Sequence, residues 1–261
     1  MKTERLLVLA KTYPVVSKKY EHLVCIAGLT EDNEWRRIYP VPWQLFWRGS
    51  QQKFKKKTWI EYKLEDDKPS DRRPESRKID WNSIKVLEEE DYREIKRRLD
   101  EKLVNLDETQ EKPDSEVSLC VVKPIIKDFF WEESEYGAKL VKMSKQITLT
   151  DGKSAVKIDP IDKKFRYVFH CCQDCHIEHR IMCEDWELGM LYLNTLKRHG
   201  PEVASFKVRE RFYEDLPKKK HLYFVLGTHN LYNTWLIISV VYPRKSDIEK
   251  LIQPSIEEFL A

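Results

Sequence analysis

The sequence predicts an α+β protein in two parts, a β-rich N-terminal part and a C-terminal part of mixed strands and helices. Short apolar or alternating segments between turn signals dominate the first 64 residues, which is typical of strands. Longer segments with helical periodicity follow, mainly in the last hundred residues. Hydrophobic residues make up 41% of the 261 residues, enough for a substantial core. The division is expected near residue 127, giving domains of residues 1–127 and 128–261.

In the N-terminal part, four strands are predicted where apolar or alternating residues lie between turn signals: 5–10, 21–28, 35–39 and 58–64. Pro40 and Pro42 are expected to end the third strand, and residues 41–47 to form a short helix or a packed loop. The polar, proline-marked segment 66–80 predicts a loop. Residues 89–103 predict a helix whose acidic residues come first and basic residues later, as the helix dipole favours.

The C-terminal part begins with less regular sequence. Residues 104–116 predict a linker or long surface loop, and 117–123 a strand. Residues 135–162 are polar, and short strands such as 146–150 and a turn at Asp151-Gly152 are expected there. The elements then predicted in order are a strand at 164–170, helices at 179–198 and 201–215, strands at 221–226 and 234–242, and a helix from about 247.

Composition and charge narrow the classes of function. Charged residues reach 35%, with Lys and Glu dominant and only seven glycines, a thermophile-like bias. The net charge of +3 is too small for a strongly basic nucleic-acid-binding protein, so any such surface must come from local segregation of charge. No apolar run approaches the roughly 18 residues of a membrane span, and the N-terminal apolar stretch is too short for a signal peptide. A cytoplasmic protein without a membrane partner is expected.

The residues with distinctive chemistry lie between positions 170 and 183, where four of the six cysteines and three of the seven histidines occur. Two cysteines in a C-x2-C pair can bind one metal ion from a tight turn. A histidine and a cysteine four residues apart share one face of a helix, so both can reach the same ion. The sequence therefore predicts a closed structural zinc site whose ligands are Cys172, Cys175, His179 and Cys183, with His170 or His176 as a replacement.

Two other interpretations of this segment remain open. A strand ending in C-x-x-C and followed directly by a helix resembles the dithiol site of thioredoxin-like proteins. That resemblance implies a thiol-disulfide oxidoreductase with Cys172 as nucleophile and Cys175 as resolving thiol. Alternatively, the metal only staples the fold of a structural or assembly protein. Nearby, Asp185 and Glu187 would diverge on a helix, so exposed acids are expected there, with Trp186 in the core.

A second feature is a basic and aromatic segment in the N-terminal part. Between residues 36 and 78, thirteen Lys or Arg face six Asp or Glu, interleaved with tryptophan, tyrosine and phenylalanine. Basic groups attract phosphates and aromatic rings stack on bases, so nucleic-acid binding is expected, with RNA favoured over DNA. The predicted phosphate contacts are Arg36, Arg37, Lys55, Lys57, Arg72 and Arg73. The outline of residues 1–103 is also similar to small PUA-type β-barrels, a resemblance that implies RNA recognition.

Overall fold

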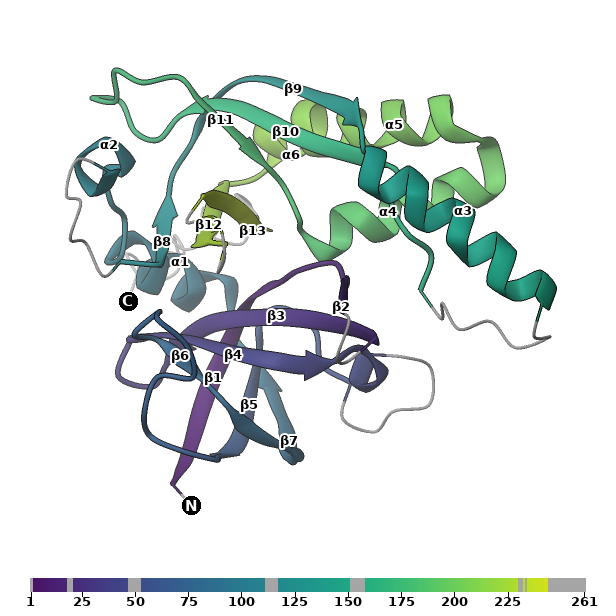
Figure 1. Cartoon of the computed structure of the whole chain (residues 1–261). Coiled ribbons are helices and arrows are strands. Elements are labelled where there is room, and N and C mark those ends of the chain that lie inside the picture. The colour runs from purple at the N-terminus through teal and green to yellow at the C-terminus, as the bar shows by residue number, and fades with distance from the viewer. Residues whose placement is uncertain are drawn as a thin grey trace, which may run out of the picture.

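The computed structural model describes residues 2–17, 21–46, 53–110, 117–150, 158–229, 232 and 234–243. These residues form three sheets and several helices, which confirms the α+β class (Figure 1). In the described part of the chain, no helix has the length and apolar composition needed to cross a membrane.

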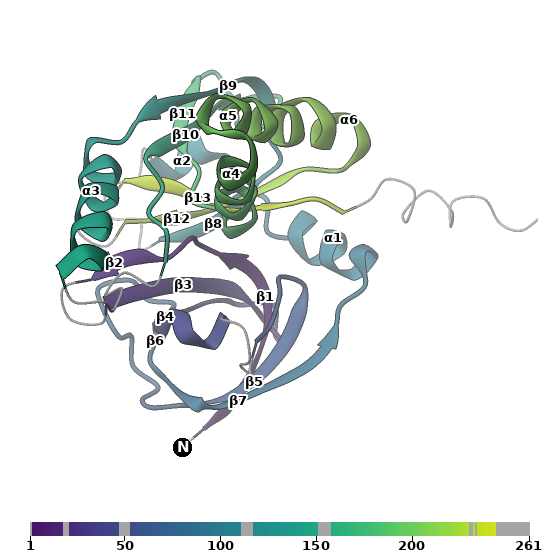
Figure 2. The same cartoon turned by 90° about the vertical axis from the view of Figure 1, so that its right-hand side faces the viewer.

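The N-terminal sheet curls into a half-barrel (Figures 1 and 2). Its strands are β1 (Thr3–Lys11), β2 (Val15–Ser17), β3 (Glu21–Thr30), β4 (Trp35–Pro42), β5 (Thr58–Leu64), β6 (Ser76–Arg77) and β7 (Ile79–Glu89). They follow the order β6-β4-β3-β1-β5-β7, with β2 beside β3. The short 3-10 helix η1 (Trp43–Phe46) packs into the barrel interior through three buried side chains. The strands at 5–10, 21–28, 35–39 and 58–64 are therefore confirmed, whereas β7 was not predicted.

Pro40 does not end β4, contrary to the prediction, whereas Pro42 is the last residue of the strand. The ladder between β3 and β4 is irregular at the step from Val24 to Ile26, opposite Tyr39 and Pro40. A proline is tolerated at such an irregularity because no ladder donor is required there. The strand therefore continues past the cis Tyr39–Pro40 bond to Pro42.

Both faces of β1 are buried because a second sheet covers the outside of the half-barrel. This sheet has the order β13-β12-β8, from β8 (Leu119–Val122), β12 (Tyr223–Thr228) and β13 (Trp235–Val241). Side chains alternate along a strand, so Leu6 and Val8 line the half-barrel interior while Leu7 and Leu9 pack against the second sheet. Helix α1 (Tyr92–Asp100), capped by Asp91, adds Ile95 and Leu99 to that interface.

The third sheet and its helices form the C-terminal core (Figure 1). The sheet has the order β11-β10-β9, from β9 (Ile125–Glu133), β10 (Lys163–His170) and β11 (His179–Met182). The helices are α2 (Leu106–Gln110), α3 (Glu135–Thr150), α4 (Trp186–His199), α5 (Pro201–Arg209), the π-helical turn η2 (Glu210–Asp215) and α6 (Leu216–Lys219). Phe129, Phe165 and Tyr167 pack against helix residues such as Tyr192 and Phe212. The Tyr167 hydroxyl donates to the Phe212 carbonyl, 2.9 Å away, inside the π-helical turn.

Three local predictions in this half are wrong. Residues 106–110, within the predicted linker or surface loop, form α2, and Leu106 is fully buried. Residues 146–150 belong to α3 and not to a strand. Their β-branched residues are typical of strands, which explains the wrong prediction. The missed signal is the helix start at Ser134, whose Oγ accepts from the Gly137 amide. Residues 179–182 form a strand, and the helix begins only at Trp186, after the Asp185 cap.

Three predictions are not settled by the described residues. The Asp151-Gly152 turn and the helix from about 247 lie outside them. The domain boundary near residue 127 stays a prediction; it falls within β9, and β8 already pairs with β12.

Candidate metal centre

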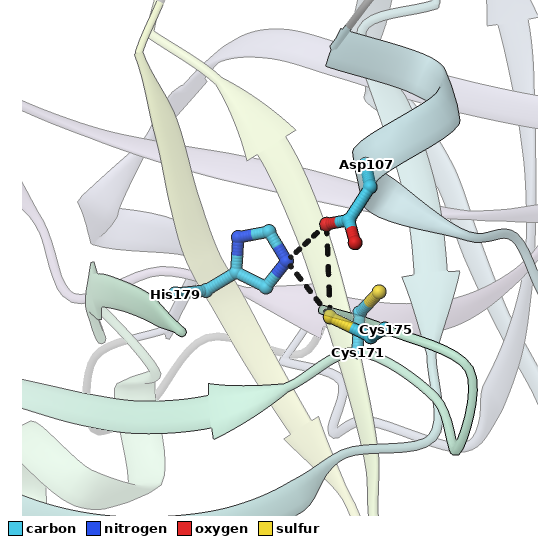
Figure 3. A group of neighbouring side chains, drawn as sticks. All are labelled: Asp107, Cys171, Cys175 and His179. Atoms are coloured by element: carbon cyan, nitrogen blue, oxygen red, sulfur yellow. Dashed lines mark hydrogen bonds and ion pairs between the residues drawn. The ribbon is translucent and has the colours of Figure 1, made fainter. Parts of the chain in front are cut away.

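Four side chains from two distant parts of the chain converge beside the third sheet (Figure 3). Asp107 lies in the first turn of α2, where the Asn105 side chain accepts from the Asp107 amide at 3.0 Å. Cys171 and Cys175 lie in the loop between β10 and β11, and His179 is the first residue of β11, paired across the sheet with Phe169. The fold therefore places a short helix over the end of a hairpin, with both contributing donor atoms.

The donor atoms lie at the spacing of ligands around one ion. His179 Nε2 is 2.9 Å from Asp107 Oδ1 and 3.5 Å from Cys175 Sγ. Cys175 Sγ is 3.6 Å from the same Asp107 oxygen, and a Cys171 donor completes a group whose atoms all lie within 4.8 Å of one another. Tetrahedral zinc, with bonds of roughly 2.0–2.3 Å, separates neighbouring donors by about 3.3–3.8 Å. The group could therefore hold a metal ion.

Backbone amides orient two of the four donors. The Leu106 amide donates to Cys171 Sγ at 3.3 Å, and the His176 amide donates to the second Asp107 oxygen at 3.3 Å. Leu106 itself is fully buried in the C-terminal core, which anchors α2. Contacts of this kind fix the direction of metal ligands and favour their anionic forms.

Burial dominates the electrostatics of the group. Cys171, Cys175 and His179 are 1%, 6% and 5% exposed. Burial raises the pKa of Cys171 to about 12, although the Leu106 amide opposes the shift. Burial also lowers the pKa of His179, against the attraction of Asp107. The imidazole is therefore biased towards the neutral form that binds metals, and a divalent cation would supply the positive charge needed to ionise a buried thiol.

The structure brings together two of the four ligands predicted from the sequence, Cys175 and His179. Cys172 Sγ lies 4.0 Å from Cys171 Sγ and outside the group. Cys183 is buried in the C-terminal core at the far end of the same extended segment. Four residues of extended chain span about 13 Å, whereas one helical turn would span about 6 Å, so Cys183 does not reach the ion that His179 can reach.

Sequence reasoning missed Asp107 and Cys171. Asp107 is more than sixty residues from the cysteines, and only the local Asn-x-Asp helix start marks it. Cys171 was visible in the Cys/His segment, but the C-x2-C pattern directed attention to Cys172.

The cations predicted to contact phosphates have partners within the chain. Arg36 donates to both oxygens of Glu4, at 2.7 and 2.8 Å. Arg37 is 1% exposed, donates to the Ser118 carbonyl at 2.8 Å and faces Glu75. The remaining partners are Asp71 and the Thr228 carbonyl for Arg73, the His229 carbonyl for Arg72, the Tyr92 ring and Glu89 for Lys57, and Glu89 for Lys55. Lys55, whose side chain is 80% exposed, and Arg72 are the exposed members of this set.

The expectation that Asp185 is exposed is wrong. Asp185 is 1% exposed, and its carboxylate accepts from Lys56 Nζ at 2.8 Å while also capping α4. Glu187, by contrast, is partly exposed and lies 3.1 Å from the same ammonium group. Trp186 packs against Phe46 of the half-barrel. The start of α4 therefore connects the two halves of the molecule.

Comparison with protein families divides the chain close to the start of α2. Residues 101–259, more than half of the chain, match the family described as Domain of unknown function (DUF8757), and the chain belongs to this family. Residues 2–103 match a second family, Domain of unknown function (DUF8758). All four residues of the candidate metal centre fall within the first of these matches. A comparison with curated proteins gives no match.

Proposed function

We propose that the protein binds one zinc ion through Asp107, Cys171, Cys175 and His179. The observation that supports this most directly is the mutual distance of 2.9–3.6 Å among Asp107 Oδ1, Cys175 Sγ and His179 Nε2. A set of two thiolates, one imidazole and one carboxylate suits zinc, whereas magnesium and calcium prefer oxygen ligands alone.

The role that fits this set is structural. Four protein donors fill a tetrahedral shell and leave no position for a reactive water. The ion would join α2 to the loop between β10 and β11, two segments otherwise connected here by weak contacts such as that from the His176 amide to Asp107. In this proposal the metal stabilises the fold of the C-terminal half and takes no part in catalysis.

The test is elemental analysis of untagged protein and of single variants. The parent should carry about one zinc per chain, and Cys175→Ser and Asp107→Asn should lose it. Cys183→Ser is the matched control, since it removes a buried thiol outside the group. Zinc retained by Asp107→Asn but lost by Cys183→Ser would favour the ligand set predicted from the sequence and contradict this one.

Nucleic-acid binding, with RNA ahead of DNA, stays a proposal based on the composition of the N-terminal half. The exposed members of the predicted set are Lys55 and Arg72, whereas Lys57 is less exposed and lies over the Tyr92 ring. A Lys55→Glu/Arg72→Glu variant should weaken retention of single-stranded RNA several-fold at low salt, because each contact is a phosphate attraction. Retention that is unchanged in the variant, or independent of salt in the parent, would contradict the proposal.

The alternative function, a thiol-disulfide oxidoreductase, predicts a different experimental result. A thioredoxin-like site relies on a helix directly after the C-x-x-C pair, whereas the turn here leads into β11. Metal-free protein that turns over a disulfide substrate, with turnover lost in Cys172→Ser, would favour the redox function over the zinc site.

A further inference from the structure

A cavity of about 230 Å³ lies apart from the candidate metal centre. It is partly open to solvent and is lined by the chain after β1, the start of α3, the segment before β10 and the start of α4. Its apolar lining includes Leu140, Ile158, Ile161, Phe165, Met182 and Leu188. Small-molecule sites typically combine an apolar wall of this kind with very few polar groups.

Most charged side chains that line the cavity are already neutralised. Lys163 pairs with Glu133, Asp159 with Lys197, and Asp185 with Lys56. Lys164 and Glu184 also line the cavity, and within the described part of the chain neither side chain forms a hydrogen bond or ion pair. Burial alone raises the pKa of Glu184 to about 7.

Two backbone hydrogen bonds join Glu184 to neighbouring segments. Its amide donates to the Ile237 carbonyl at 2.9 Å, and its carbonyl accepts from the Tyr13 amide at 2.8 Å. Cys183, Glu184 and Asp185 all line the cavity, so this short stretch of chain forms part of its wall. Glu184 is partly exposed, so its unpaired carboxylate is accessible to a ligand that enters the cavity.

We propose that this cavity binds a small molecule with an apolar body and a protonated amine that pairs with Glu184. The amine would provide the positive charge that the described side chains do not give this carboxylate. The apolar wall would receive the body of the ligand. The volume is below the roughly 300–1,000 Å³ of drug-sized sites, so the ligand is of the size of a phenylalkylamine.

The probe for this site is 2-phenylethylamine, with 2-phenylethanol as its neutral counterpart of the same shape. Calorimetry at pH 8 should show the amine binding at least tenfold more tightly than the alcohol. In Glu184→Gln the affinity for the amine should fall at least tenfold, while that for the alcohol stays the same. Glu88→Gln, which changes an exposed acid on β7, should behave as the parent.

Thermal unfolding gives a second readout that also shows whether Glu184→Gln is folded. The amine should raise the melting temperature of the parent and not that of Glu184→Gln, since a ligand stabilises only the state that binds it. Equal binding of amine and alcohol, or an unchanged response in Glu184→Gln, would overturn the proposal. Zinc content should be the same in all these proteins, so the outcome is independent of the metal centre.

Discussion

Two carboxylates in this molecule, one buried and one half-buried, have their negative charge balanced in different ways. Asp185, at the start of α4, receives its counter-charge from Lys56, which reaches across from the half-barrel. Asp107, on α2, lies among two thiols, an imidazole and a backbone amide, and its strongest partner is a histidine whose pKa is lowered by burial. The comparison indicates that a lysine of the chain balances the charge of Asp185. At Asp107, a bound cation would balance the charge of the carboxylate and the thiols.

The largest effect is expected from removing the internal cation. Lys56→Ala would leave Asp185 buried without a positive partner and should cost about 3–5 kcal/mol of unfolding free energy. Lys55→Ala, which removes the exposed side chain of the preceding residue, should change the unfolding free energy by less than about 0.5 kcal/mol. Urea unfolding measures both. If the two variants were equally stable, Asp185 would not depend on Lys56 and the contrast between the two regions would fail.

Metal removal should have the next largest effect. A chelator should lower the unfolding free energy of the zinc-loaded parent by about 3 kcal/mol, the value for a ligand present at roughly one hundred times its dissociation constant. Cys175→Ser should already have the lower stability and should not respond to the chelator. Parallel melting curves with and without chelator test this. A parent that carries zinc yet does not respond would show that the ion does not support the fold.

These two regions also show what the sequence could and could not predict. The strands and the fold class follow from local apolar patterns, which burial in the sheets confirms. The Cys/His segment was recognised as a possible metal centre, and two of its residues join the group in the structure. The ligand set depended on treating residues 179–183 as a helix. In an extended chain the same spacing separates His179 from Cys183.

Long-range partners were beyond reach for a physical reason. Asp107 meets Cys175, and Lys56 meets Asp185, only after sheets and helices have packed, and no local periodicity records either contact. The composition of residues 36–78 likewise predicted a basic surface. Several of those cations are instead held by acids or carbonyls, such as Arg36 by Glu4 and Arg37 by Ser118.

The smallest expected effect concerns a second lysine near the internal ion pair. Lys11 is buried, lies over the rings of Phe46 and Trp186, and has a pKa lowered to about 8, first by burial and then by repulsion from Lys56. Between pH 8 and the ordinary lysine pKa of 10.5, the unfolded chain binds more protons than the folded chain, so stability should rise with pH in this window.

Lys11→Met should therefore stabilise the protein by about 1–2 kcal/mol at pH 7, after allowing for the lost attraction to the two rings. The gain should shrink as pH approaches 10.5, where the parent no longer has to accommodate a charge. Unfolding free energies at pH 7 and pH 10 measure the difference directly. A variant less stable than the parent at pH 7 would mean that the rings and the Phe54 carbonyl, 3.4 Å from Nζ, hold the charge well. Lys11 would then belong with Lys56 as a second internal counter-ion.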